Sequence, residues 1–339
     1  MKELLRELCT LDGVAGYEDE VREVIMQKVA PYAAEMTVDP LGNLIVFKKG
    51  AKERKRPVVL CAHMDEVGFL VRDITPDGMI RLATVGGIDP RVLVGRRMKV
   101  GPKKVPGVIS IKAIHLTTAE ERKSAPGIDQ LYVAIGAQTR AEVETLTQIG
   151  DPVFFDSAFY EMGDRCVKST AIDDRVGCYM LLAAIMNVKK PKNDIYLAFT
   201  VQEEVGTRGG QVTAQRIQPD IGVAVDVTPC HDRPGDLEGS NALDHGVAIK
   251  ISDTGSISDE GLVNKSIALC KEHNIPYQKD IIYVGGTDAG AMTLVGGGIK
   301  TIGFSVVTRY THGPNAIVSQ KDIEATVKML ELFMNADFE

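Results

Sequence analysis

The amino-acid sequence predicts an α/β protein with a mostly parallel sheet and a small inserted β-barrel-like domain. Strand and helix patterns alternate after residue 165, which is typical of a parallel sheet. Residues 67–162 instead contain short β runs separated by Gly and Pro. The chain has 339 residues, enough for one large domain or two unequal ones. We therefore expect an α/β domain formed by residues 1–66 and 163–339, interrupted by a β-rich domain at 67–162.

Two amphipathic helices are predicted at the N-terminus, because apolar residues recur there at helical spacing. The apolar positions are Leu4, Leu5 and Leu8 in the first helix and Val21, Val24, Ile25 and Val29 in the second. Gly13 and Gly16 predict a turn between the helices, and Pro31 predicts the end of the second one.

The α/β domain is predicted from apolar strands and the helices between them. The expected strands are residues 44–47, 57–62, 194–201, 221–227, 247–251 and 301–307. The expected helices lie near residues 174–188, 261–273 and 320–334. Parallel neighbours need a crossover connection, usually a helix, so this alternation assigns the strands after residue 165 to one largely parallel sheet.

The insert has a different pattern. Its expected strands are residues 68–71, 79–83, 97–100, 107–111 and 131–135, with one helix at 140–148. Several short strands bounded by turn residues favour a small closed or stacked β structure.

Composition and charge exclude several classes of partner. The chain has 39 Lys and Arg against 46 Asp and Glu, a net charge of -7, so it lacks the basic field that nucleic acids and anionic membranes attract. The longest apolar run, residues 179–186, is far shorter than the roughly 20 residues of a membrane span. Charged residues interrupt the first thirty positions, which argues against a signal peptide and predicts a cytoplasmic protein. The six cysteines form no Cys-x-x-Cys pair, so no thiolate zinc site is predicted.

Five short segments place His, Asp or Glu residues at predicted strand ends or at a helix start. These residues are His63 and Asp65, Asp173 and Asp174, Glu203 and Glu204, Asp226, and His312. Each has an ordinary explanation by itself, such as a core histidine, a helix cap or a solvent-facing acid. Together they favour a single crevice, because open α/β sheets bind ligands at the carboxyl ends of their strands.

The chemistry of these residues indicates a metal site. Imidazole and carboxylate donors without cysteine suit Zn, Co or Mn. The carboxylates exceed the needs of one ion, so the sequence predicts two divalent ions per chain and leaves one acid as a general base. Side chains alternate along a strand, so His63 and Asp65 point to the same side, where a carboxylate can orient a metal-bound imidazole.

As a set, these motifs resemble the M42 family of dinuclear metallo-aminopeptidases, which includes glutamyl and tetrahedral aminopeptidases. The resemblance covers essentially the whole chain and implies a zinc-exopeptidase-like catalytic domain. It rests on Ala-His-Met-Asp-Glu-Val-Gly at 62–68, Ile-Asp-Asp-Arg at 172–175, Glu-Glu-Val-Gly at 203–206, Asp226, and Arg-Tyr-Thr-His-Gly-Pro at 309–314.

The resemblance implies a role for each site residue. The implied metal ligands are His63 and Asp226 for one ion, Glu204 and His312 for the other, and Asp173 as the bridge. The implied catalytic residues are Glu203, as the general base, and Asp65, which would orient His63. The implied substrate contacts are Thr287, Asp288 and Gly290, in a Gly-rich stretch that lacks the Lys-Ser/Thr ending of a phosphate-binding loop.

The expected function is therefore removal of N-terminal residues from short peptides by a metal-dependent aminopeptidase. A dinuclear carboxypeptidase or deacylase would use a similar set of ligands. A glycosidase would need paired carboxylates without metal, but the chain has no Trp and only 5% aromatic residues for stacking sugar rings. A non-enzymatic binding protein would leave the ligand array unused.

Assembly is also implied by the resemblance. The inserted domain would join subunits into homodimers, and dimers would build a homododecamer of tetrahedral shape. The alternative is that the insert forms a lid over the active site.

Overall fold

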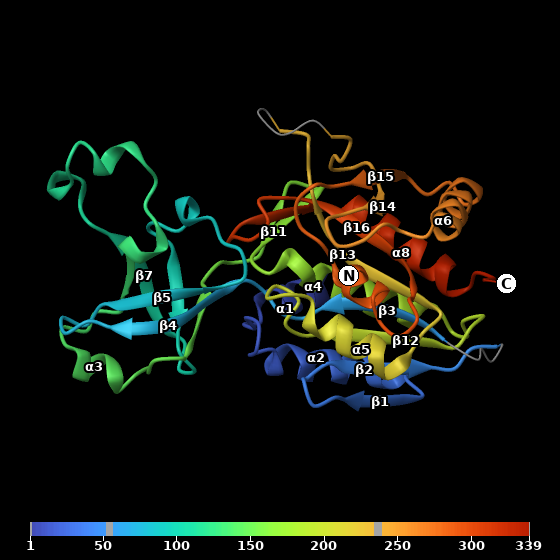
Figure 1. The fold of residues 1–339 in the computed structure, drawn as a ribbon, viewed down its shortest axis with the longest axis horizontal. Coiled ribbons are helices and arrows are strands. Elements are labelled where there is room, and N and C mark those ends of the chain that lie inside the picture. The colour runs from blue at the N-terminus through green and yellow to red at the C-terminus, as the bar shows by residue number, and fades with distance from the viewer. Residues whose placement is uncertain (1, 52–56, 234–238, 339) are drawn as a thin grey trace.

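A computed structural model describes residues 2–51, 57–233 and 239–338. It consists of an α/β body and a closed β-barrel that lies to one side of this body (Figure 1). The predicted α/β fold with a separate small β domain is therefore confirmed.

The body is built around a sheet of eleven strands in the order β1-β2-β12-β3-β13-β16-β17-β11-β10, with β14 attached to β16 and β15 attached to β14. Its strands are β1 (Glu35–Val38), β2 (Leu44–Lys48), β3 (Val58–His63), β10 (Tyr160–Met162), β11 (Cys166–Ser169), β12 (Ile195–Thr200), β13 (Ile221–Pro229), β14 (Val247–Ser252), β15 (Tyr277–Ile281), β16 (Lys300–Arg309) and β17 (Ala316–Ser319). The adjacent strands β12, β3, β13 and β16 run parallel and form the centre of the sheet.

The strand predicted at 247–251 differs from its expected orientation. It is β14, which pairs antiparallel with β16 and parallel only with β15. The described parts of the connection from β13 to β14 contain no helix, so the crossover that a parallel neighbour of the central strands would need is missing there. The outer strands β1, β10, β11 and β17 also make antiparallel pairs.

Helices cover both faces of the sheet (Figure 1). One face packs against α1 (Lys2–Thr10), α2 (Asp19–Val29), α4 (Ile172–Asn187), α6 (Glu260–Glu272) and α8 (Gln320–Met334). The other packs against α5 (Arg208–Ile217) and α7 (Asp288–Thr293). In β3, Leu60 and Ala62 belong to the first core and Val59 and Cys61 to the second. Burial on both faces explains why the central strands are continuously apolar in sequence.

The barrel has the strand order β4-β5-β8-β7-β6-β9 and closes on itself. Its strands are β4 (Gly68–Ile74), β5 (Ile80–Val85), β6 (Arg97–Val100), β7 (Val105–Ile111), β8 (Leu131–Ala134) and β9 (Pro152–Phe155). It encloses its own apolar core, in which the rings of Phe69 and Phe155 pack edge to face at 5.6 Å. The barrel strands end at residue 155, and β10 already belongs to the large sheet, so the predicted boundary at 162 lies beyond the barrel.

The remaining helices are short. They are α3 (Arg140–Glu144) and the 3-10 turns η1 (Ala30–Tyr32), η2 (Pro90–Val92), η3 (Ile114–Leu116), η4 (Glu121–Lys123) and η5 (Ile128–Gln130). The predicted helix at 140–148 is thus limited to α3, and α2 ends at Val29, just before Pro31, as expected.

Ion pairs connect the barrel to the body. Asp12, which is 6% exposed, pairs with Lys99 at 2.6 Å and with Lys104 at 3.0 Å. Asp12 lies in the loop after α1, whereas Lys99 and Lys104 come from the barrel side of the chain. These pairs therefore link the loop after α1 to the barrel strand β6 and to the turn before β7.

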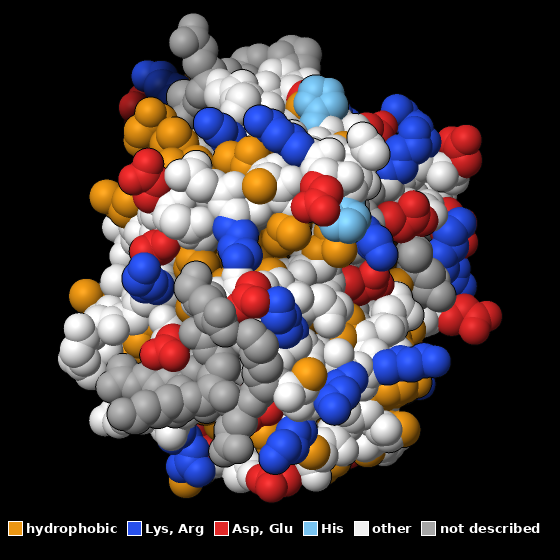
Figure 2. Space-filling view, turned by 90° about the vertical axis from the view of Figure 1, so that its right-hand side faces the viewer, with side chains coloured by type: hydrophobic (Ala, Val, Ile, Leu, Met, Phe, Trp, Pro, Cys, Tyr) orange, Lys and Arg blue, Asp and Glu red, His pale blue; other side chains and the backbone are white. Residues whose placement is uncertain are grey.

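Surface charge is mixed. On the described part of the face away from the barrel, Lys and Arg side chains alternate with Asp and Glu (Figure 2). In residues 2–51, 57–233 and 239–338, no helix is both long enough and apolar enough to cross a bilayer.

Candidate metal centre and active site

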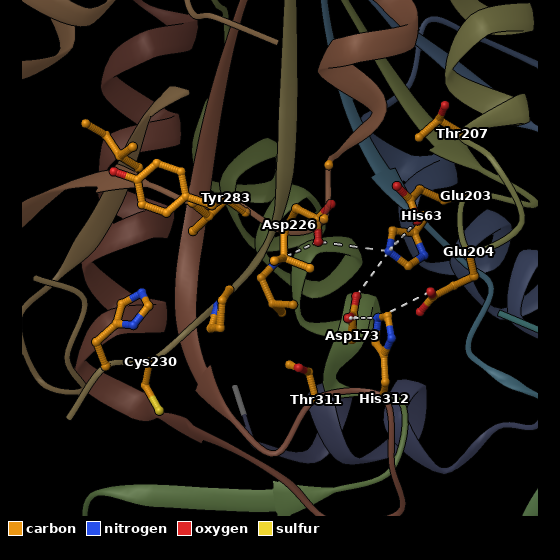
Figure 3. A pocket seen from close by; sticks show the side chains of 18 of the residues that line it. His63, Asp173, Glu203, Glu204, Thr207, Asp226, Cys230, Tyr283, Thr311 and His312 are labelled. Carbon is orange, nitrogen blue, oxygen red and sulfur yellow. Dashed lines mark hydrogen bonds and ion pairs between the residues drawn. The ribbon is translucent and has the colours of Figure 1, made fainter. Parts of the chain in front are cut away.

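The residues predicted as metal ligands meet at one edge of the sheet (Figure 3). His63 ends β3, Glu203 and Glu204 follow β12, and Asp226 lies near the end of β13. Asp173 stands at the start of α4 and His312 in the loop after β16. The strands β3, β12 and β13 carry or directly precede these residues, and because they run parallel their carboxyl ends open at the same edge.

Asp173 lies between the two histidines. Its Oδ1 is 3.1 Å from His63 Nε2, and its Oδ2 is 3.3 Å from His312 Nε2. Glu204 Oε2 is also 3.3 Å from His312 Nε2, and Asp226 Oδ1 is 4.0 Å from His63 Nε2. One carboxylate thus offers an oxygen to each of two clusters, one with His63 and Asp226 and the other with His312 and Glu204.

Asp174, the neighbour of Asp173, has another role in the structure. Its ligand atoms lie near those of His63 and Asp226, within 4.8 Å. However, its carboxylate accepts hydrogen bonds from Gly177 N at 3.0 Å and His63 N at 3.3 Å. Asp174 therefore ties α4 to β3, and we retain Asp173 as the proposed ligand.

The acids of this cluster repel one another in a buried setting. Burial raises the pKa of Glu204 to about 8, and the Asp173 carboxylate adds to that shift. Burial likewise raises the pKa of Asp226 to about 7. For Asp173 burial acts in the same direction, but hydrogen bonds from His312 and His63 outweigh it and bring its pKa below the ordinary value.

This electrostatic arrangement fits divalent cations. Glu204 Oε1 is buried and has no hydrogen-bond partner in the described structure. Buried carboxylates are costly unless a counter-charge or hydrogen bonds satisfy them. Histidine nitrogens and carboxylate oxygens at these spacings are the donor types that Zn, Co and Mn accept.

Asp65 contacts His63, but mainly through its backbone. His63 Nδ1 is 3.0 Å from the Asp65 carbonyl oxygen and 3.5 Å from Asp65 Oδ1. The Asp65 carboxylate accepts hydrogen bonds from the backbone N–H groups of Glu203 and Glu204, each at 3.0 Å. The Asp65 carboxylate thus holds the backbone of the two glutamates, and its orienting role toward His63 stays a prediction.

Glu203 is positioned differently from the ligands. Its side chain is 11% exposed, and its Oε2 is 3.9 Å from His63 Nε2. It lines a cavity together with His63, Asp173 and Asp226. Burial raises the pKa of Glu203 well above the ordinary value, and the nearby Asp226 carboxylate adds to this rise.

A cavity of about 740 Å³ extends from this group of His and acidic residues. Its other lining residues include Val227, Pro229, Cys230, His231 and Arg233 after β13 and the segment from Ile281 to Gly286. Apolar side chains dominate these walls, which is usual for a site that holds an organic ligand.

The predicted substrate contacts are not part of this wall. Thr287 and Asp288 are both 3% exposed, and Thr287 caps α7 by accepting a hydrogen bond from Ala289 N. Asp288 accepts a hydrogen bond from Thr200 Oγ1 at 2.7 Å, and Gly290 packs against the backbone of Gly255. None of these three residues lines the cavity, whereas Gly285 and Gly286, just before them, do.

Comparison with known proteins identifies the family. The sequence model described as M42 glutamyl aminopeptidase matches residues 42–329. The chain belongs to the M42 family. A putative aminopeptidase of Acetivibrio thermocellus is 37% identical to it over 330 residues, which cover 97% of this chain and 97% of the relative.

Solved M42-like structures agree with this assignment. The TET aminopeptidase of the marine sediment archaeon Thaumarchaeota archaeon SCGC AB-539-E09 is 32% identical, with a TM-score of 0.95 over 98% of this chain and 96% of that one. The TET1 peptidase of Pyrococcus horikoshii, described as assembling into a tetrahedron or a large octahedral shell, is 32% identical, with a TM-score of 0.89 over 98% of each chain. The predicted family is thus confirmed.

A buried arginine connects several segments next to the site of this M42 peptidase. Arg175 is fully buried and donates hydrogen bonds to the backbone carbonyls of Met64 (2.6 Å), Leu8 (2.8 Å), Leu11 (3.0 Å) and Gly13 (3.3 Å). Its guanidinium is also 3.7 Å from the Glu66 carboxylate. One side chain therefore joins α1, the following loop and the segment after His63.

Replacing this arginine should destabilise the fold. We expect Arg175→Met to lower the free energy of unfolding by about 3–5 kcal/mol, because buried carbonyls and the Glu66 carboxylate lose their partner. Urea unfolding followed by circular dichroism measures the change. Arg216→Met, at an exposed position of α5, is the matched control and should stay within about 0.5 kcal/mol of the parent. A loss below 1 kcal/mol for Arg175→Met would contradict this account.

Proposed function

We propose that this protein is a dinuclear metal-dependent aminopeptidase that removes N-terminal residues from short peptides. The observation that carries the proposal is the Asp173 carboxylate, which faces a histidine with each of its oxygens. The neighbouring acids Glu204 and Asp226 and a further glutamate, Glu203, line the same cavity. Membership of the M42 family supports peptide hydrolysis as the reaction.

The proposed ligands divide into two groups around Asp173. His63 and Asp226 would hold one ion, and Glu204 and His312 would hold the other. Zn or Co suits these donors best, and Mn is the alternative. When bound, such ions polarise the scissile carbonyl and lower the pKa of a bound water.

The protein's own groups would then handle the protons. A carboxylate oxygen of Glu203 accepts a proton from the attacking water and returns it to the departing amine. The free amino group of the substrate would dock against neighbouring carboxylates of the cluster. Asp65 keeps Glu203 in place through its bond to the Glu203 backbone N–H.

Peptides with blocked ends test the reaction. We expect cleavage of a peptide with a free N-terminus and an amidated C-terminus, and no cleavage when the N-terminus is acetylated. Cleavage of an N-acetylated peptide with a free C-terminus, but not of the C-amidated peptide, would indicate a carboxypeptidase. Release of the acetyl group alone would indicate a deacylase. Hydrolysis of a soluble cellulose derivative without peptide cleavage would support the glycosidase. A panel of acidic, basic and apolar N-terminal residues then defines the side-chain preference.

We further propose that the barrel joins subunits into homodimers that build a homododecamer. The shell described for the Pyrococcus horikoshii relative supports this proposal. So do apolar side chains exposed on the barrel side of the chain, which include Val94, Val108, Ile114 and Leu116. Closed symmetric assemblies form readily from such self-complementary patches. A shell of this kind would admit short peptides and exclude folded proteins.

Assembly is tested by light scattering. The parent protein should have the mass of twelve chains, and the double variant I114E/L116E should release smaller species, because a charge is unfavourable in an apolar contact. Lys189→Glu, on the surface of the α/β body, is the control and should leave the mass unchanged. A parent protein that stays monomeric across concentrations would instead favour the barrel as a lid over the active site.

A further inference from the structure

Residues 201–204, which we call the glutamate loop, are held by side chains from three other segments. Each of its four consecutive backbone N–H groups donates to a side-chain oxygen. The bonds are Val201 N to Asn43 Oδ1 (3.0 Å), Gln202 N to Glu18 Oε1 (3.1 Å), Glu203 N to Asp65 Oδ1 (3.0 Å) and Glu204 N to Asp65 Oδ2 (3.0 Å). The position of both glutamates therefore depends on residues distant in sequence.

The backbone of this loop needs such support. Gln202 has φ = 55°, in the left-handed region that non-glycine residues rarely adopt. Such a conformation is strained and persists only when the surrounding structure holds it. Because Gln202 directly precedes Glu203, a rotation at this residue would redirect both glutamate side chains.

Glu18 is the side chain that holds Gln202. It occupies the N-cap position of α2 but makes no side-chain hydrogen bond to that helix. Instead, its Oε1 accepts from Gly16 N at 2.8 Å and from Gln202 N at 3.1 Å. The residue is 4% exposed, and a buried carboxylate is unfavourable unless it is hydrogen-bonded. Glu18 is thus directed to the glutamate loop rather than to its own helix, without lining the cavity.

We propose that Glu18 is a positioning residue for the reaction. By accepting the Gln202 N–H, it fixes the orientation in which the Glu203 carboxylate can transfer a proton. This inference rests on the proposed role of Glu203 as the general base. A displacement of about 1 Å at a reacting group can cost about 10²-fold in rate, so loss of this bond should lower kcat measurably.

Three variants test the proposal, with kcat, KM and metal content measured at saturating metal. Glu18→Met keeps the side-chain length but lacks an acceptor, and should lower kcat by roughly 10–100-fold with KM little changed. Glu18→Gln keeps an oxygen at the same place and should restore most of the turnover. Glu23→Met, at an exposed position of α2, is the matched control and should match the parent. An unchanged kcat in Glu18→Met, or an equal loss in Glu18→Gln, overturns the proposal.

A variant that keeps the charge covers the case in which Glu18→Met does not fold. Glu18→Asp is one methylene shorter, cannot bridge Gly16 and Gln202, and should also reduce kcat. A folded Glu18→Asp enzyme with parental kcat overturns the proposal.

A double variant separates positioning from general support of the fold. If Glu18 acts through Glu203, adding Glu18→Met to Glu203→Gln should lower the residual kcat by less than about twofold, because effects of residues acting as a unit are not additive. If Glu18→Met lowers kcat as much in the Glu203→Gln background as in the parent, Glu18 does not act through Glu203 and the proposal is overturned. Near-normal turnover of Glu203→Gln alone is a separate result, which refutes the proposed base.

Discussion

Replacing Glu203 with Gln is expected to lower kcat by roughly 10²–10⁴-fold, the usual range for loss of a general base. The amide keeps the size of the side chain but cannot accept a proton at neutral pH. Glu203 is largely buried beside the proposed metal ligands, and its backbone N–H stays bonded to Asp65 whichever side chain is present. The variant should therefore retain the loop geometry and its metal. Steady-state kinetics together with elemental analysis of the purified variant measure both effects.

The adjacent glutamate is the matched control for this assignment. Glu204→Gln removes a proposed ligand whose Oε2 lies 3.3 Å from His312 Nε2. We expect this variant to lose bound metal, whereas Glu203→Gln keeps it. Loss of metal in Glu203→Gln with retention in Glu204→Gln would show that the two roles are exchanged. Near-normal turnover in Glu203→Gln would show that Glu203 is not the general base.

Most of the site was predictable because its residues follow strong local signals. The apolar strands β3, β12 and β13 are buried on both faces, so their ends can be located in sequence. Since they run parallel, the His and acidic residues at these ends had to share one edge of the sheet. The insert was similarly recognisable from its short strands and its Gly and Pro turns.

The features that were not predicted depend on contacts between distant segments. Glu18 and Gln202 are 184 positions apart, and Asn43 and Val201 are 158 apart, so no periodicity or motif relates them. The contacts of Arg175 to the α1 region are equally remote in sequence. The direction of β14 was not predictable either, because its antiparallel pairing is set by its partner β16 and not by its own residues. The short helices α5 and α7 lack the long apolar periodicity that identifies a helix.

The structure also changes the expected role of the Gly-rich stretch near residue 288. Asp288 resembles a site residue in sequence, but its carboxylate is buried against Thr200, and a side chain at Gly210 would collide with it. The absence of a side chain at Gly210 allows α5 and α7 to pack closely against each other. Asp288 therefore holds Thr200, the residue just before the glutamate loop, and Gly285 and Gly286, which line the cavity, are the better candidates for substrate contact.

Removal of metal is expected to reduce hydrolysis to the uncatalysed background, and about two divalent ions per chain should restore it. Without cations, burial and the nearby Asp173 carboxylate raise the pKa of both Glu204 and Asp226, because no positive ion offsets their charge. Ions that bind only the folded chain also stabilise it, so the chelated protein should unfold at a lower temperature and regain its Tm on reloading with Zn or Co. Dialysis against a chelator, stepwise addition of metal and elemental analysis provide the stoichiometry.

The position of Asp173 makes this prediction specific to two ions. Because its two oxygens face His63 and His312 separately, Asp173→Asn should weaken binding at both sites, whereas Asp226→Asn should weaken binding mainly at the His63 site. The expected content is therefore well below two ions for Asp173→Asn and close to one for Asp226→Asn under matched conditions. Full activity after exhaustive chelation would exclude the metal mechanism. A parent protein that saturates at one ion, with Asp173→Asn and Asp226→Asn equally affected, would show that the carboxylates surround a single ion and that Asp173 does not bridge.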